Sequence, residues 1–162
     1  MNLWQKFEKK QNKEKNNKKI SLHFQNGIDK ELKKLFITFT RWLRINYIFP
    51  TNIHVYIVNS EKIRLLDETL AYGSFRWFAN RTPMIRIASA IEKELLTEYK
   101  KEEIYEQILS SFVHELTHYY QWLLQLEQSN ASSERQANHF RYKIIDKYLD
   151  ETKQNKGQLW KR

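Results

Sequence analysis

Residues 114–118 read His-Glu-Leu-Thr-His, and this spacing strongly limits how the segment can fold. The two histidines lie four residues apart, so they share one face if the segment is an α-helix. Apolar residues recur at three- and four-residue spacing around them, which predicts a helix over residues 101–126. On this helix His114 and His118 can bind one Zn²⁺ ion while Glu115 reaches a water molecule beside it. We therefore expect one zinc ion per chain.

A catalytic zinc site usually has three protein ligands, so a third must lie elsewhere in the chain. Glu134 opens the next predicted helix and is the first candidate for this role. One turn later, Asn138 is positioned to accept a hydrogen bond from a ligand imidazole. His139, on the same predicted helix, is the rival third ligand. It lies about 140° around the helix from Glu134, so only one of the two should bind the metal.

Residues 134–140 read Glu-Arg-Gln-Ala-Asn-His-Phe. Together with the His-Glu-x-x-His segment, they resemble the ImmA/IrrE-type metallopeptidases, small gluzincins in which a Glu-x-x-Ala-(Asn/Asp)-x-Phe helix supplies the third ligand. The resemblance covers residues 104–145 and implies that His114, His118 and Glu134 bind zinc. After Phe140 the chain departs from the family pattern, which often continues as Leu-Leu-Met-Pro. A second resemblance, to SprT-like zincins, would make His139 the third ligand, but their Gly-flanked histidine is absent.

The motif predicts a zinc-dependent endopeptidase that acts on a protein or peptide substrate, with Glu115 as general base. A further group should stabilise the negative charge that develops on the carbonyl oxygen. The candidates for this role follow in sequence: Tyr119, Tyr120, His139, Arg141 and Tyr142. Zincins of this kind carry a strand before the active-site helix that pairs with extended substrate. We expect this strand to comprise Met84, Ile85, Arg86, Ile87, Ala88 and Ser89.

The rest of the chain predicts an α+β fold, a small zincin-like domain with a short mixed or antiparallel sheet packed on the active-site helix and two or three further helices. Alternating or β-branched residues predict strands at 21–24 and 52–59 and a hairpin over 70–89. Pro83 suggests that the second hairpin strand lies near an edge. Helical spacing predicts helices at residues 29–47, 91–99 and 134–149.

Charge is concentrated at the N-terminus, where residues 1–20 hold seven lysines and no arginine and carry +5 of the total charge of +9. We expect a basic, flexible tail over residues 1–20, one domain over 21–150 and a polar tail over 151–162. An alternative is a catalytically silent zincin-fold or SprT-like protein that binds nucleic acid through the lysine-rich tail. The chain has no cysteine, secretory signal or apolar span, which favours a cytoplasmic protein without membrane contact.

Overall fold

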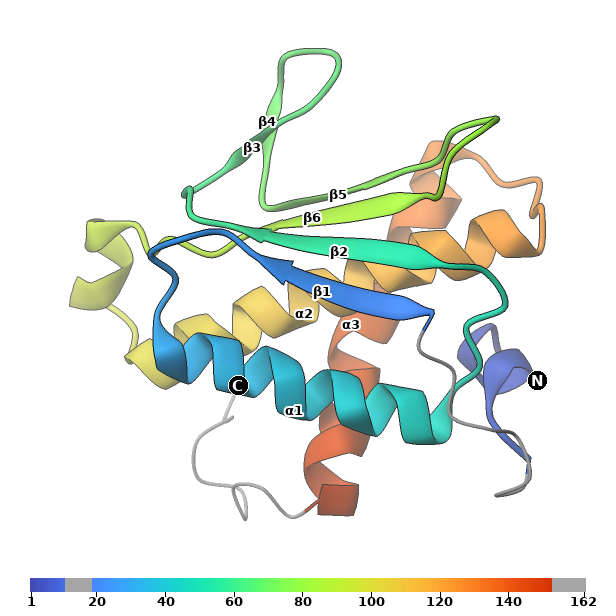
Figure 1. The fold of residues 1–162 in the computed structure, drawn as a ribbon, viewed down its shortest axis with the longest axis horizontal. Helices are drawn as coiled ribbons and strands as arrows, with labels where there is room; N and C mark the ends of the chain where they lie inside the picture. Colours follow the sequence, from blue (N-terminus) through green and yellow to red (C-terminus); the bar gives the residue numbers. More distant parts are fainter. Residues whose placement is uncertain (11–18, 153–162) are drawn as a thin grey trace.

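A four-stranded mixed sheet lies over a layer of helices (Figure 1). This computed structural model describes residues 1–10 and 19–152 and confirms the expected α+β class. The strand order is β1-β2-β6-β5, in which β1, β2 and β6 are parallel and β5 is antiparallel to β6. The strands of this sheet are β1 (Ile20–Phe24), β2 (Ile53–Val58), β5 (Gly73–Arg76) and β6 (Met84–Ala88). A separate antiparallel pair, β3 (Ile63–Arg64) and β4 (Leu70–Ala71), rises from the sheet (Figure 1).

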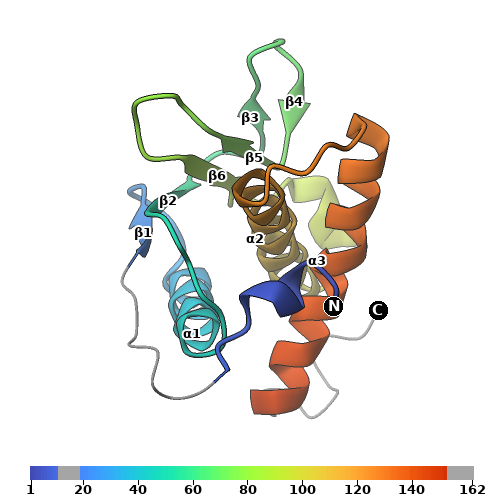
Figure 2. The ribbon, with the colours of Figure 1, turned by 90° about the vertical axis from the view of Figure 1, so that its right-hand side faces the viewer.

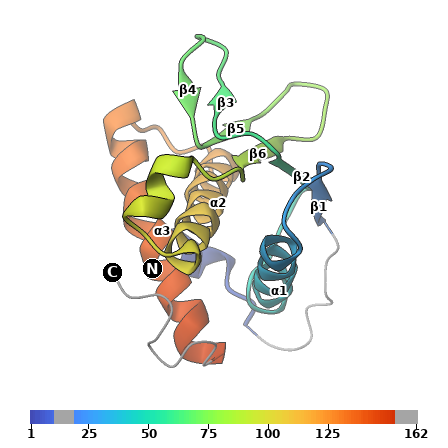
Figure 3. The ribbon, with the colours of Figure 1, turned by 90° about the vertical axis from the view of Figure 1, so that its left-hand side faces the viewer.

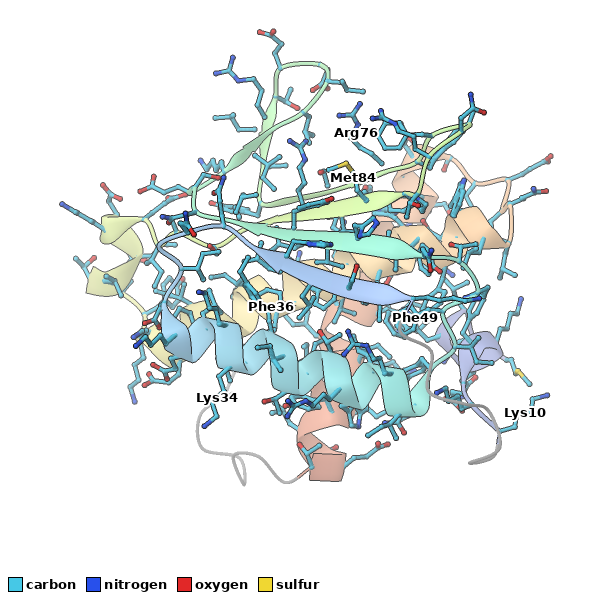
Figure 4. The ribbon with its side chains drawn as sticks, viewed as in Figure 1. Lys10, Lys34, Phe36, Phe49, Arg76 and Met84 are labelled. Atoms are coloured by element: carbon cyan, nitrogen blue, oxygen red, sulfur yellow. The ribbon has the colours of Figure 1, made fainter. Side chains whose placement is uncertain are left out.

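The two faces of the sheet differ because side chains alternate along each strand. On β2, Ile53, Val55 and Ile57 face the helices and are fully buried. Figure 4 shows Phe36 between α1 and the sheet, and Met84 and Arg76 on the far side of the sheet from the helices. These last two residues are cross-strand partners on β6 and β5. The core therefore lies between the sheet and the helices.

The helix layer is built from α1 (Lys30–Asn46), α2 (Lys101–Leu123) and α3 (Asn130–Thr152), with 3-10 turns at Trp4–Phe7 and Lys93–Thr97. End-on views show α2 directly below β5 and β6, with α3 alongside it (Figures 2 and 3). The third helix begins at Asn130, four residues earlier than expected, because the Ser129 hydroxyl accepts a hydrogen bond from the backbone of Ser132 and stabilises the first turn. None of the described helices is both long and apolar enough to cross a membrane.

The prediction that residues 84–89 form an edge strand is wrong. The strand they contain, β6, is paired on both sides, with β2 and with β5, so it has no free edge for a substrate. Pro83 precedes the first residue of the strand, and its missing N–H therefore removes no ladder hydrogen bond within β6. The free edge beside α2 belongs to β5, the first strand of the hairpin.

The prediction of a flexible tail over residues 1–20 is wrong for the first ten residues. Leu3, Trp4 and Phe7 are buried in the main hydrophobic core. The indole N–H of Trp4 donates to the hydroxyl of Thr117 on α2 at 3.0 Å, and Phe7 stacks on Tyr120. Residues 11–18 and 153–162 lie outside the described residues, and α3 continues to Thr152, past the expected boundary at 150.

Candidate metal centre

The middle of α2 places three chemically active side chains under the edge of the sheet. His114 and His118 lie one turn apart, and their Nε2 atoms are 3.2 Å from each other. Both imidazoles are largely buried, and their side chains are 12% and 16% exposed. The structure therefore brings the two histidines together as the four-residue spacing predicts.

Glu134, in the second turn of α3, reaches across to both histidines. One carboxylate oxygen lies 3.0 Å from His114 Nε2 and the other lies 3.0 Å from His118 Nε2. The candidate ligand atoms of these three residues all fall within 4.8 Å of one another. His139, the rival ligand, is exposed and packs its ring edge-on against Phe140, so it is not part of this group.

Hydrogen bonds around His118 determine which of its ring nitrogens is free. The Gln121 side-chain amide donates to the carbonyl oxygen of Ser133 at 3.1 Å, which fixes the orientation of that amide. The Oε1 atom of Gln121 then accepts a hydrogen bond from His118 Nδ1 at 2.8 Å. With the proton on Nδ1, the lone pair of Nε2 faces His114 and Glu134.

The sequence predicts Asn138 in this supporting role, and the structure contradicts that prediction. Asn138 is exposed, and within the described part of the chain no hydrogen bond joins it to either imidazole. The side of α3 that packs on α2 runs through Glu134, Ala137 and Arg141, so Asn138 lies farther around the helix toward solvent. Gln121, from α2 itself, takes its place.

The donor set fits a zinc ion. Two imidazole nitrogens and one carboxylate meet at hydrogen-bonding separations, and a cation stabilises such a cluster of electron-pair donors. Burial is the main cause that lowers the pKa of His114 to about 4, and the neighbouring His118 lowers it further. A neutral imidazole is the form that binds metal ions.

Glu115 lies next to this group but faces the sheet. It is 7% exposed, and its Oε2 atom lies 3.9 Å from His114 Nε2. Burial raises the pKa of its carboxyl group to about 8, and the negative charge of Glu134 adds to the effect, while Arg141 opposes it. In its surroundings the Glu115 carboxyl group holds a proton more strongly than an ordinary glutamate does.

Only one of the five candidates for stabilising an oxyanion lines the cavity that contains the histidines and Glu134. That residue is Arg141, whose guanidinium donates to the hydroxyls of Ser110 and Ser111 at 2.9 to 3.2 Å. The phenols of Tyr119 and Tyr120 instead donate to backbone carbonyls of Thr51 and Ile48, in the core. Two further candidates also lie outside the cavity: His139 is exposed, and Tyr142 donates to Gln107.

The cavity has a volume of about 960 Å³ and is open between β5, the β3–β4 hairpin and the start of α3. Its walls include Gly73 and Phe75 of the edge strand, together with Trp77, which is 59% exposed. Gly73, Gln121 and Ser133 all line the cavity, and the sequence motifs do not identify them as site residues. Of these three, only Gln121 has a signal in the sequence, because it follows His118 by one turn on the same helix.

Comparisons of the chain with protein-family models, with curated proteins and with solved structures found no match.

Proposed function

We propose that this protein is a zinc-dependent endopeptidase that cleaves an extended protein segment in the cytoplasm. The observation that carries the proposal is the convergence of His114, His118 and Glu134 beside the buried Glu115, at the base of a large open cavity. This is the ligand set that the resemblance to ImmA/IrrE-type metallopeptidases implies. The geometry supports it independently of that resemblance.

The residues of the cavity have complementary chemical roles. A zinc ion held by the three ligands would supply Lewis-acid chemistry, which makes water more acidic and polarises a peptide carbonyl. Glu115 accepts the proton from the attacking water and returns it to the leaving amine. Arg141, held in place by Ser110 and Ser111, can donate a hydrogen bond to the carbonyl oxygen as negative charge develops there.

The free edge of β5 can bind the backbone of an extended substrate. The N–H of Ala88 on β6 donates to the carbonyl of Tyr72, the residue just before β5, so this pair is hydrogen-bonded across the hairpin. Hydrogen-bonding direction alternates along an antiparallel strand. The N–H and C=O groups of Gly73 and Phe75 therefore point away from β6, to the edge that borders the cavity. A substrate strand added there would pass over Glu115.

The test is hydrolysis of a complex mixture of unfolded peptides, analysed by mass spectrometry. The zinc-loaded protein should cleave a reproducible subset of these peptides, and a chelator should stop cleavage. Glu115→Gln should lower kcat by about 10²- to 10⁴-fold while zinc remains bound, as expected for the loss of a general base. Gln125→Glu, at the cavity rim, serves as a control that also interchanges an amide and a carboxylate. Equal activity of the parent and Glu115→Gln, or no cleavage by the zinc-bound parent, would overturn the proposal.

A further inference from the structure

A second, smaller cavity adjoins the first on the other side of Arg141. Its volume is about 340 Å³, and it lies between the end of β6, the 3-10 turn at Lys93–Thr97 and the first half of α2. Its walls are mainly apolar and are formed by Ala88, Ala90, Ile91, Leu95, Ile104 and Ile108.

The two cavities share part of their walls. Tyr72, Ser111 and Arg141 line both of them. Ser111 lies one turn before Glu115 on α2, so the smaller cavity opens next to the proposed general base. A peptide backbone on the edge of β5 would have one side chain within reach of this opening.

Charge at the mouth limits which side chains can enter. The Arg141 guanidinium stands at the shared wall and repels lysine and arginine side chains. The carboxylates of Glu61 and Glu92 also line the cavity and repel an acidic side chain, and the apolar walls offer it no hydrogen bonds. Glu92, at the rim, already pairs with Lys62 at 3.8 Å and accepts a hydrogen bond from the phenol of Tyr72 at 3.2 Å.

We propose that the smaller cavity binds one apolar substrate side chain, of the size of leucine, methionine or phenylalanine, next to the scissile bond. This inference rests on the proposed peptidase function and names its specificity. Burial of such a side chain supplies binding energy in proportion to the apolar area removed from water. Glycine, aspartate or lysine at that substrate position gains no such energy.

The first experiment needs neither metal nor catalysis. The isoleucine methyl groups are followed by NMR while N-acetyl-leucine amide is added, with the lysine and aspartate analogues as comparison probes. The leucine probe should shift the methyl signals of Ile104 and Ile108 in a saturable way, and the charged probes should not. Ile108→Trp, which fills the cavity, should abolish the response, and Ile37→Trp, on the exposed side of α1, should leave it intact. Equal responses to all three probes, or no saturable response, would overturn the inference.

The second experiment compares cleavage-site profiles of the zinc-loaded parent and Ile108→Trp. The parent should show one position next to the scissile bond that is enriched in large apolar residues. In Ile108→Trp, kcat/KM for those peptides should fall at least tenfold, while peptides with glycine or alanine there remain substrates. An unchanged profile would overturn the specificity inference alone. No cleavage by the parent would overturn the peptidase proposal and this inference with it.

Discussion

Gly73 on β5 lies directly against Glu115 on α2. A Cβ atom at position 73 would approach both Cγ and Oε2 of Glu115 to 3.1 Å, and Cδ1 of Ile87 to 3.2 Å. Such contacts are closer than carbon atoms normally adopt in a packed interior. The absence of a side chain at this position therefore gives the carboxylate its room.

Gly73→Ala should displace the Glu115 carboxylate and lower kcat for peptide hydrolysis about tenfold, which corresponds to about 1.4 kcal/mol in the activation barrier. Zinc binding should be unchanged, since the alanine contacts no candidate ligand. The measurement is kcat together with zinc content, and Ser74→Ala, directed to the opposite face of the sheet, is the control. Unchanged turnover in Gly73→Ala would contradict the importance of this contact.

Metal analysis separates the two candidates for the third ligand. Purified parent protein supplied with zinc should retain one ion per chain, Glu134→Ala should lose it and His139→Ala should keep it. Zinc should also raise the stability of the parent, by about 2.7 kcal/mol at a free concentration of about 100 times Kd. Thermal unfolding with and without chelator measures this difference. Loss of zinc in His139→Ala alone would contradict the ligand set.

The N-terminal residues should contribute substantially to stability. Trp4 is 1% exposed and packs edge-on against Tyr47 and Tyr120. Trp4→Ala should therefore lower the free energy of unfolding by about 3 to 5 kcal/mol, as expected for a large aromatic residue in a core. Lys6→Ala, at an exposed position of the same segment, should change it by less than about 0.5 kcal/mol. Urea unfolding of both variants tests this, and similar small effects would contradict it.

The buried N-terminus also determines how the nucleic-acid alternative can be tested. Deletion of residues 1–20 would remove Trp4 and Phe7 from the core, so substitution of Lys13, Lys15 and Lys18 by glutamine is the cleaner change. For a peptidase that acts without nucleic acid, peptide turnover should be the same in this variant and should not respond to added duplex DNA. No peptide turnover by the zinc-loaded parent, together with salt-dependent DNA binding that the glutamine variant lacks, would favour the alternative.

Acid should weaken the contact between the start of α1 and the start of α2. The hydroxyl of Tyr105 donates to Asp29 at 2.6 Å and Lys101 lies 3.4 Å from the same carboxylate, and these contacts lower the pKa of Asp29 below its usual 3.8. A carboxyl group with a lowered pKa in the folded state stabilises the fold above its ordinary pKa, and this contribution is lost as pH falls through the folded-state pKa.

The free energy of unfolding should therefore fall more for the parent than for Asp29→Asn between about pH 6 and about pH 3, a range that spans the ordinary pKa of aspartate. Urea unfolding at both pH values measures the difference. Because the other carboxyl groups titrate equally in the two proteins, identical losses would contradict the prediction.

Local patterns predicted the main helices and the central strand. Leu32, Phe36 and Phe39 are buried on α1 because their spacing follows the helical period, and Ile53 and Val55 are buried on β2 because they alternate. The grouping of the histidines with Glu134 was also within reach of sequence reasoning. The two histidines lie one helical turn apart, and a short loop joins their helix to the helix that carries Glu134.

The errors concern contacts between distant segments. The seven lysines of residues 1–20 suggested a solvated tail, although the segment also contains Leu3, Trp4 and Phe7. The partners of these apolar residues are distant in sequence, such as Tyr47 and Thr117 for Trp4. Pro83 suggested an edge position for the strand that follows it, but that strand, β6, pairs with both β2 and β5. Strand order depends on contacts across the whole sheet, which one proline does not reveal. The partner of His118 is Gln121, and not Asn138, because the rotation of α3 about its axis depends on its packing against α2.

The bond between Trp4 and Thr117 spans 113 positions of the chain. During synthesis the N-terminal segment emerges first, yet its partners on α2 are made only when most of the chain is complete. Its apolar side chains therefore cannot complete their packing in the core until the histidine-bearing helix has been synthesised. The same helix carries Thr117 and the two histidines, so the packing of Trp4 on α2 and the metal centre both require that this helix has been made.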